Sequence, residues 1–132
     1  WVRVRRASIS LPQSPMPITV FCFDATLAKP IHKYASAGAA SCELAHGDGE
    51  CHAYAVHFEP GGNIGPHPAG FDQLFLVISG SGWVAGGDGV RHPVGAQSGA
   101  FIPRGETHSK GSETGMVAVM IQASRFAGEP SP

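Results

Sequence analysis

The strongest constraint on this chain is the way glycine and proline divide it into short apolar segments. Its 132 residues include 18 glycines and 11 prolines. Glycine supplies turns and bulges, and proline interrupts helices, so turns must be frequent and long helices few. Short apolar segments between glycine turns, without helical periodicity, are typical of sandwiches and barrels. We therefore predict an all-β fold.

Individual strands follow from alternation and from β-branched or aromatic runs. Large apolar side chains alternate with small or polar ones over residues 52–59, a period of two that predicts a strand. The glycine-rich segment Gly86–Gly89 predicts a hairpin between strands at 83–85 and 90–94. Further strands are predicted at 18–23, 41–45, 74–78, 100–102 and 116–121, with turns at 46–49 and 80–82 and a helical turn or loop at 24–40.

The length fits one domain, with no internal repeat or low-complexity tract. Residues 1–17 carry three prolines and little periodicity, so we predict an extended N-terminal arm there. Residues 18–125 are predicted to form a single barrel, and residues 126–132 a flexible tail.

The strands at 74–78 and 116–121 are apolar on both faces. A barrel strand with one face in the interior and one in water would alternate apolar and polar side chains. A strand that is apolar on both faces therefore needs something to cover its outer face. Charged residues make up 14% of the chain, below the roughly 25% of an average soluble protein. We therefore predict a homodimer in which the N-terminal arm or a second subunit covers the outer face.

Charge and cysteine content exclude several classes of partner. The formal net charge of −1 provides no basic field for nucleic acid or anionic lipid. No apolar run approaches the ~20 residues of a membrane span, and no apolar segment follows the N-terminal arginines as in a secretory signal.

Cys22, Cys42 and Cys51 form neither a disulfide framework nor a zinc spacing, so reduced thiols and a cytoplasmic location are expected.

Two separated segments carry the functional signal. The first runs from Pro60-Gly61 through His67 and Gln73 to Gly80, and the second is Pro103-Arg104-Gly105-Glu106-Thr107-His108. Together they resemble the two motifs of the cupin superfamily, in the RmlC-like, type-2 conserved barrel group. The resemblance covers roughly residues 50–122. It implies a cupin-type double-stranded β-helix, or jelly-roll barrel, of about 8–10 strands.

The first motif departs from the family pattern at two positions. Cupins with the full set bind a divalent metal through three histidines and one glutamate, but here Ala69 replaces the second histidine and Gln73 the glutamate. The resemblance leaves His67, Gln73 and His108 as candidate ligands. Without a carboxylate, such a set suits Zn²⁺, Ni²⁺ or Cu²⁺ better than Fe²⁺ or Mn²⁺. The alternative is a pair of histidines in a pocket without metal.

Two carboxylates, Asp72 and Glu106, lie near the motifs and are candidates to replace the missing glutamate. Strand alternation points Asp72 to the face opposite Gln73, so it is not expected at the site. An extended segment would place Glu106 on the same side as His108.

The predicted ligand site combines two imidazoles, an amide and apolar walls. If Gln73 points inward, strand alternation turns Phe75 inward as well, and Phe101 is predicted to lie near the same wall. The predicted ligand-binding residues are His67, Gln73, Phe75, Phe101 and His108. Such a barrel mouth suits a small, partly apolar ligand, and a neutral histidine can act as a general base near pH 7. The sequence identifies no activated nucleophile.

Three functions remain open at this point. The first is a cupin-fold protein that binds a small molecule, with weak metal binding or none. The second is a metal-dependent enzyme, such as an isomerase, lyase or oxygenase, acting on a small organic substrate. The third is a structural or interaction module that keeps the barrel only as a scaffold. One fold hosts many functions, so the fold does not decide among them.

Overall fold

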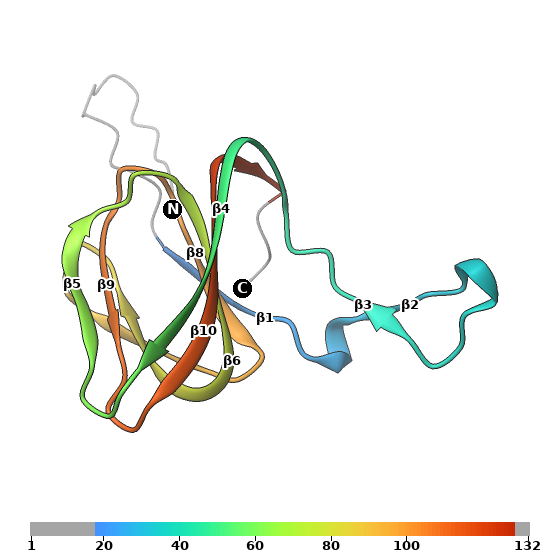
Figure 1. Cartoon of the computed structure of the whole chain (residues 1–132), viewed down its shortest axis with the longest axis horizontal. Coiled ribbons are helices and arrows are strands. Elements are labelled where there is room, and N and C mark those ends of the chain that lie inside the picture. Colours follow the sequence, from blue (N-terminus) through green and yellow to red (C-terminus); the bar gives the residue numbers. More distant parts are fainter. Residues whose placement is uncertain (1–17, 129–132) are drawn as a thin grey trace, which may run out of the picture.

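The computed structural model describes residues 18–128, and the predicted arm at 1–17 and the end of the tail lie outside this range. The all-β prediction is confirmed, because residues 18–128 form ten strands and two short 3₁₀ helices and no α-helix (Figure 1). No helix in this part of the chain is long and apolar enough to cross a membrane.

The elements follow one another in a simple order along the chain. The strands are β1 Thr19–Cys22, β2 Lys29–Pro30, β3 Ala40–Ser41, β4 His46–Phe58, β5 Asn63–Pro68, β6 Asp72–Ala85, β7 Arg91–Gly95, β8 Ser98–Ile102, β9 Thr107–Gly111 and β10 Met116–Ala127, and the 3₁₀ helices are η1 Ala25–Leu27 and η2 Lys33–Ala35.

Two antiparallel layers form the barrel. The first has the strand order β1-β8-β6-β10-β4, and in the second β6 pairs with β7 and β9, and β9 with β5. The long strand β6 belongs to both layers, because residues 72–80 pair with β10 and residues 81–85 pair with β7. In Figure 1, β5 and β9 lie on the left of the barrel, and β4 and β10 lie to their right.

Strand β6 crosses from the first layer to the second at Gly80, where the sequence predicted that the strand ends. Gly80 has a φ of 80°, and an added Cβ would lie 2.3 Å from the carbonyl oxygen of Gly115. Only glycine fits such a positive φ and close backbone approach without strain. The prediction of a turn at 80–82 is therefore wrong, because the chain bends there and continues as the same strand.

Three other boundaries differ from the sequence prediction. The predicted turn at 46–49 is the start of β4, where residues 46–48 pair with the end of β10. Of the predicted strand at 41–45, only Ser41 lies in a strand. It belongs to β3, which pairs with β2 in a small ribbon projecting from the barrel (Figure 1). The predicted tail begins too early, because β10 continues to Ala127.

Alternating residues of the strands fill the interior between the layers. Phe75 and Val77 of β6 are fully buried there. They pack with Phe58, Ala69, Val84, Val94, Ala100, Ile102, Met116 and Ala118. The inward direction predicted for Phe75 is therefore confirmed.

The predicted position of Phe101 is wrong. In the register of β6 and β8, Phe101 lies opposite Leu74, whereas Ile102 lies opposite Gln73. Directly opposite residues share a face of the sheet, so Phe101 points away from the interior. It belongs to a second cluster on the outer face of the first layer, with Phe21 and Leu74. Ile102 takes the inner position that was predicted for Phe101.

The outer face of the first layer is covered in part by the chain itself. Phe126 of β10 packs edge-on against Phe101, at 6.5 Å between ring centroids. Ile78 at the far end of the apolar run remains 52% exposed. The homodimer stays a prediction, and this exposed end is a part of the face that residues 18–128 leave uncovered.

The dimer prediction can be checked with one charge substitution. We expect the wild-type protein to show a dimer mass by light scattering at micromolar concentration. Ile78→Lys is expected to shift the mass toward the monomer, because a lysine buried in an apolar interface loses its hydration. Val90→Lys is a matched control, since Val90 is also 52% exposed but lies in the hairpin between β6 and β7. A wild-type protein that is only monomeric would contradict the prediction.

Candidate functional site

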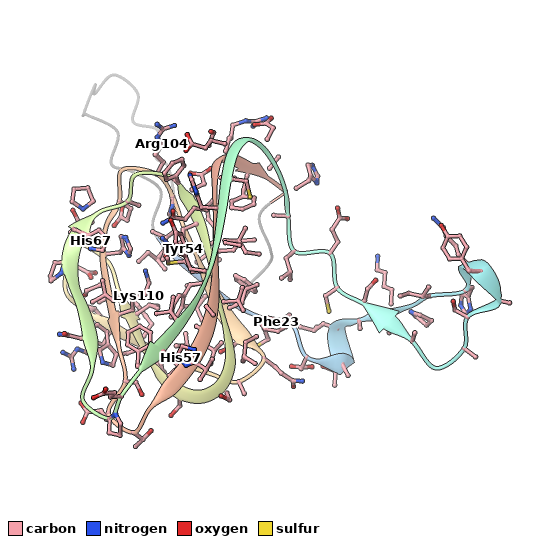
Figure 2. The ribbon with its side chains drawn as sticks, in the orientation of Figure 1. Phe23, Tyr54, His57, His67, Arg104 and Lys110 are labelled. Atoms are coloured by element: carbon pink, nitrogen blue, oxygen red, sulfur yellow. The ribbon has the colours of Figure 1, made fainter. Side chains whose placement is uncertain are left out.

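A polar cluster lies inside the otherwise apolar barrel. Alternation along β9 points His108 and Lys110 to the same inner face, and Gln73 faces them from β6. These side chains are 1%, 1% and 3% exposed, respectively. The Lys110 Nζ donates a hydrogen bond to Gln73 Oε1 at 2.7 Å and lies 3.0 Å from His108 Nδ1. Figure 2 shows Lys110 within the barrel, to the right of β5.

The second motif positions His108 through a tight turn. The amide of Glu106 donates to the carbonyl of Pro103 at 3.1 Å, and Gly105 between them has a φ of 89°. The amides of Gly105 and Ala69 donate to the carbonyls of Ala69 and Glu106, at 2.8 and 2.9 Å. The turn therefore attaches to the end of β5, and β9 starts directly after it at Thr107.

The two predicted histidines are brought together. His67 on β5 lies opposite His108 on β9, and their ring centroids are 4.4 Å apart. The Nδ1 of His67 lies 2.8 Å from the carbonyl oxygen of Gly65, which fixes its ring orientation. His67 is exposed whereas His108 is buried. His67 therefore lies between His108 and solvent, at the β5 side of the barrel (Figure 2).

His108 has one nitrogen without a partner. With Lys110 as the donor, Nδ1 of His108 accepts, and the ring hydrogen is assigned to Nε2. This Nε2 is buried and has no hydrogen-bond partner within residues 18–128. A buried unpaired donor costs about 1–3 kcal/mol, which makes this atom the least satisfied point of the cluster.

Sequence reasoning missed Lys110. The sequence feature that could have found it is its position two residues after His108, because residues i and i+2 of a strand lie on the same face. No strand was predicted at 107–111, because the segment Thr107-His108-Ser109-Lys110-Gly111 contains no apolar residue. The pairing of β9 with both β5 and β6, rather than local propensity, makes it a strand.

The carboxylates near the motifs are used elsewhere. Asp72 accepts hydrogen bonds from the backbone amides of Arg104 and Phe126, at 2.8 and 2.9 Å, which confirms that it faces away from the cluster. Glu106 Oε2 is 3.4 Å from the amide of Gly87, in the hairpin between β6 and β7. Glu106 therefore does not join His108 as the sequence suggested for an extended segment.

Comparison with known proteins gives a result for structure only. No sequence-family model matches the chain, and no curated protein matches it. An RmlC-like cupin from Shewanella frigidimarina has a TM-score of 0.53 and 24% identity, with coverage of 58% of this chain and 68% of that one. The chain has the cupin fold. The predicted double-stranded β-helix is thereby confirmed.

Two further solved structures agree with this fold. A cupin-like protein from Thermotoga maritima has a TM-score of 0.54 and 21% identity, and covers 60% of this chain and 65% of that one. A protein with a double-stranded β-helix domain from Klebsiella pneumoniae has a TM-score of 0.53 and 18% identity, over 77% and 90%. Similarity at these identities carries the fold and not the function.

The cupin barrel does not present the predicted metal ligands in a form that fits a divalent ion. Gln73 Oε1 and His108 Nδ1 both point at the Lys110 amine, which lies between them. Ala69 fills the position of the missing histidine with a buried methyl group. Within residues 18–128, no three His, Cys, Asp or Glu side chains gather closely enough to hold a metal. An amine thus lies between Gln73 and His108, two of the three residues that were predicted to converge on an ion.

Burial changes the protonation of this cluster. It lowers the pKa of Lys110 from 10.5 to about 7, because the ammonium loses its hydration inside the barrel. Burial, and after it the neighbouring Lys110 and His67, together lower the pKa of His108 from 6.5 to about 3. No carboxylate in the described part of the chain pairs with Lys110 to oppose this effect.

These shifts predict how stability depends on pH. Between pH 7 and 10.5 the unfolded chain binds the Lys110 proton and the folded chain does not, so the free energy of unfolding should rise with pH. Each unit of pKa difference contributes about 1.4 kcal/mol. We expect urea unfolding to show a rise of a few kcal/mol in wild type that Lys110→Met lacks.

The matched control for this experiment is Lys33→Met, because Lys33 is exposed on η2. It should reproduce the wild-type dependence on pH. Parallel curves for wild type and Lys110→Met would show that Lys110 keeps an ordinary pKa in the folded protein.

Proposed function

We propose that this cupin-fold protein binds a small organic molecule in the barrel through an oxygen atom that accepts a hydrogen bond from His108 Nε2, without a metal ion. The observation that carries the proposal is the buried, unpartnered Nε2 of His108. A ligand oxygen at this nitrogen would remove the cost of the unmet hydrogen bond, which is about 1–3 kcal/mol.

The surroundings of His108 favour an oxygen with negative character. The Lys110 nitrogen is held 3.0 Å from the other side of the same ring. A positive or strongly polar N–H donor next to the site favours a carboxylate or a carbonyl over a neutral ether or hydroxyl oxygen. The ligand class that fits is therefore a small carboxylic acid, aldehyde or ketone.

The apolar side chains next to this polar cluster favour a ligand with a short apolar chain. Phe75 and Ile102 are fully buried in the interior cluster, and Phe75 lies under Lys110 with 5.0 Å from Nζ to the ring centroid. The exposed ring of His67 borders His108 on the solvent side, where it would contact an entering ligand. His67, Gln73, Phe75 and His108 thus remain the proposed binding residues, with Lys110 added and Phe101 removed.

The two alternative functions have less support. A metal-dependent isomerase, lyase or oxygenase needs a ligand set that the amine of Lys110 disrupts. A barrel kept only as a scaffold gives no reason to bury an unpaired imidazole beside a lysine, since such groups cost stability. A cytoplasmic location fits the cysteine content and remains part of the proposal.

Propionate is a suitable probe of the binding mode, because it joins a carboxylate to a short apolar chain. In protein labelled with ¹⁵N-histidine, we expect propionate to shift the His108 Nε2 signal most, to shift the neighbouring His67 less, and to leave the other five histidines largely unchanged. The signal is assigned by its loss in His108→Phe. No shift of this signal at millimolar propionate would contradict the proposed function.

Metal content separates the proposal from the metal-dependent alternative. After dialysis against Zn²⁺ or Ni²⁺ and removal of free ion, we expect less than one ion per chain by elemental analysis. The reason is that the Lys110 amine already lies between two of the predicted ligands. Stoichiometric metal that is lost in both His67→Ala and His108→Phe would instead support the metal-dependent enzyme.

A further inference from the structure

The segment that projects from the barrel receives little support from its own chain. This projecting segment comprises residues 25–41 with η1, β2, η2 and β3, and none of its residues is buried. Its two strands have two residues each, and an isolated pair of strands is at best marginally stable in water. The projecting segment therefore needs a further surface on which to pack.

The tip of the projecting segment combines backbone strain with an exposed aromatic side chain. Tyr34 and Ala35 have φ values of 60° and 56°, a left-handed conformation that is unfavourable for residues with a Cβ atom. Such strain persists where surrounding contacts hold the backbone in place. Tyr34 is also 91% exposed, and tyrosine is among the side chains that most often anchor an interface. The tip thus has the features of a contact made with another molecule.

A complementary apolar surface lies on the outer face of the first layer. In the registers of β10 with β4 and β6, Val119 lies opposite Ala55 and Leu76, so the three side chains share one face of the sheet. Leu76 packs against the outer cluster, which identifies this face as the outer one. Val119 and Leu76 are half-buried, whereas Ala55 and Ile78 are exposed. Residues 18–128 therefore leave part of an apolar sheet face open to solvent.

The projecting segment leaves the barrel next to this face. Phe23 before the segment and Leu44 after it both pack against the outer cluster that contains Phe101. Figure 2 shows Phe23 between the barrel and the projecting segment. In Figure 1 the segment extends away from the barrel on the side of β4 and β10 that is opposite to β5 and β9. A second barrel placed against the outer face would therefore lie beside the projecting segment.

Charge favours contact of the projecting segment with a barrel rather than with a second projecting segment. Residues 25–41 contain Lys29 and Lys33 but no aspartate or glutamate, so two such segments repel each other. Strand β4 carries the exposed carboxylates of Asp48 and Glu50, which pair at the surface with an arginine and a histidine. Exposed pairs of this kind contribute little and can be exchanged for others. The barrel thus offers charge of the opposite sign.

We propose that two copies of this chain pack the outer faces of their first layers together, and that each projecting segment extends onto the barrel of the other copy with Tyr34 as an anchor. A twofold axis through the outer face meets both needs at once, because each copy supplies the same face and the same segment. From Ala25 to Tyr34 an extended chain spans roughly 30 Å, which is enough to pass the edge of the facing sheet. This contact assigns elements to the homodimer expected from the sequence, and it is independent of the ligand proposed for His108.

Photo-crosslinking from the tip tests the contact in the full-length protein. The photoreactive aromatic amino acid p-benzoylphenylalanine is placed at position 34. Equal amounts of ¹⁴N- and ¹⁵N-labelled protein are mixed at low concentration, concentrated and irradiated. We expect mixed-isotope peptide pairs that join position 34 to β4, β6 or β10, since such pairs form only between two chains. Links confined to one chain, residues 1–17 included, or no links at all would overturn the proposal.

Tyr34→Ser measures the contribution of the anchor. By sedimentation equilibrium we expect the dissociation constant of the dimer to rise about 30-fold, the effect typical of an aromatic anchor in an interface. The barrel should fold as before, because Tyr34 is 91% exposed. Val90→Ser is the matched control, since Val90 is exposed in the hairpin between β6 and β7, and it should leave the dissociation constant unchanged.

The outcomes separate the projecting segment from the dimer as such. If Ile78→Lys separates the two copies but Tyr34→Ser does not weaken them, the dimer stands and the role of the projecting segment is overturned. A wild-type protein that is monomeric at micromolar concentration would overturn both. Neither result bears on the binding of propionate at His108, which is measured by its own signal.

Discussion

The hydrogen bonds of the Lys110 amine inside the barrel determine the character of the whole site. The bond to Gln73 joins the two layers, because Gln73 lies in the part of β6 that pairs with β8 and β10, whereas Lys110 lies on β9. Burying an amine costs free energy unless its polar hydrogens find acceptors, and Gln73 and His108 supply them. The same contacts leave His108 Nε2 as the buried side-chain atom that finds no hydrogen-bond partner among residues 18–128.

The departures from the full cupin ligand set are consistent with one another. Ala69 fills the place of one histidine with a methyl group in the interior cluster, and Gln73 provides an acceptor without a negative charge. A carboxylate at residue 73 would have paired with Lys110, and a histidine at residue 69 would have added a ligand for a metal. Ala69, Gln73 and Lys110 together thus leave a buried amine, rather than a set of metal ligands, in this part of the barrel.

Much of the barrel could be predicted where large apolar side chains mark the strands. The runs in β4, β6 and β10 were found, since their interior residues alternate or form continuous apolar segments. β5 and β9 were missed, because their sequences are rich in glycine, proline and polar residues and only pairing with neighbouring strands makes them extended. Phe101 was assigned to the wrong face because its register with Leu74 is set by the partner strand and not by its own sequence.

The sequence by itself determined the all-β class and the two motifs, because turn residues and motif spacing are local properties of the chain. The meeting of His67 with His108 followed only from the resemblance of those motifs to the cupin pattern. Only the tertiary structure decided that Lys110 lies between Gln73 and His108, and that Glu106 and Phe101 lie elsewhere. The physical reason is that the direction of a side chain in a strand depends on where the strand starts and bends. In this protein those points are set at Gly80 and Gly105 by contacts with distant backbone.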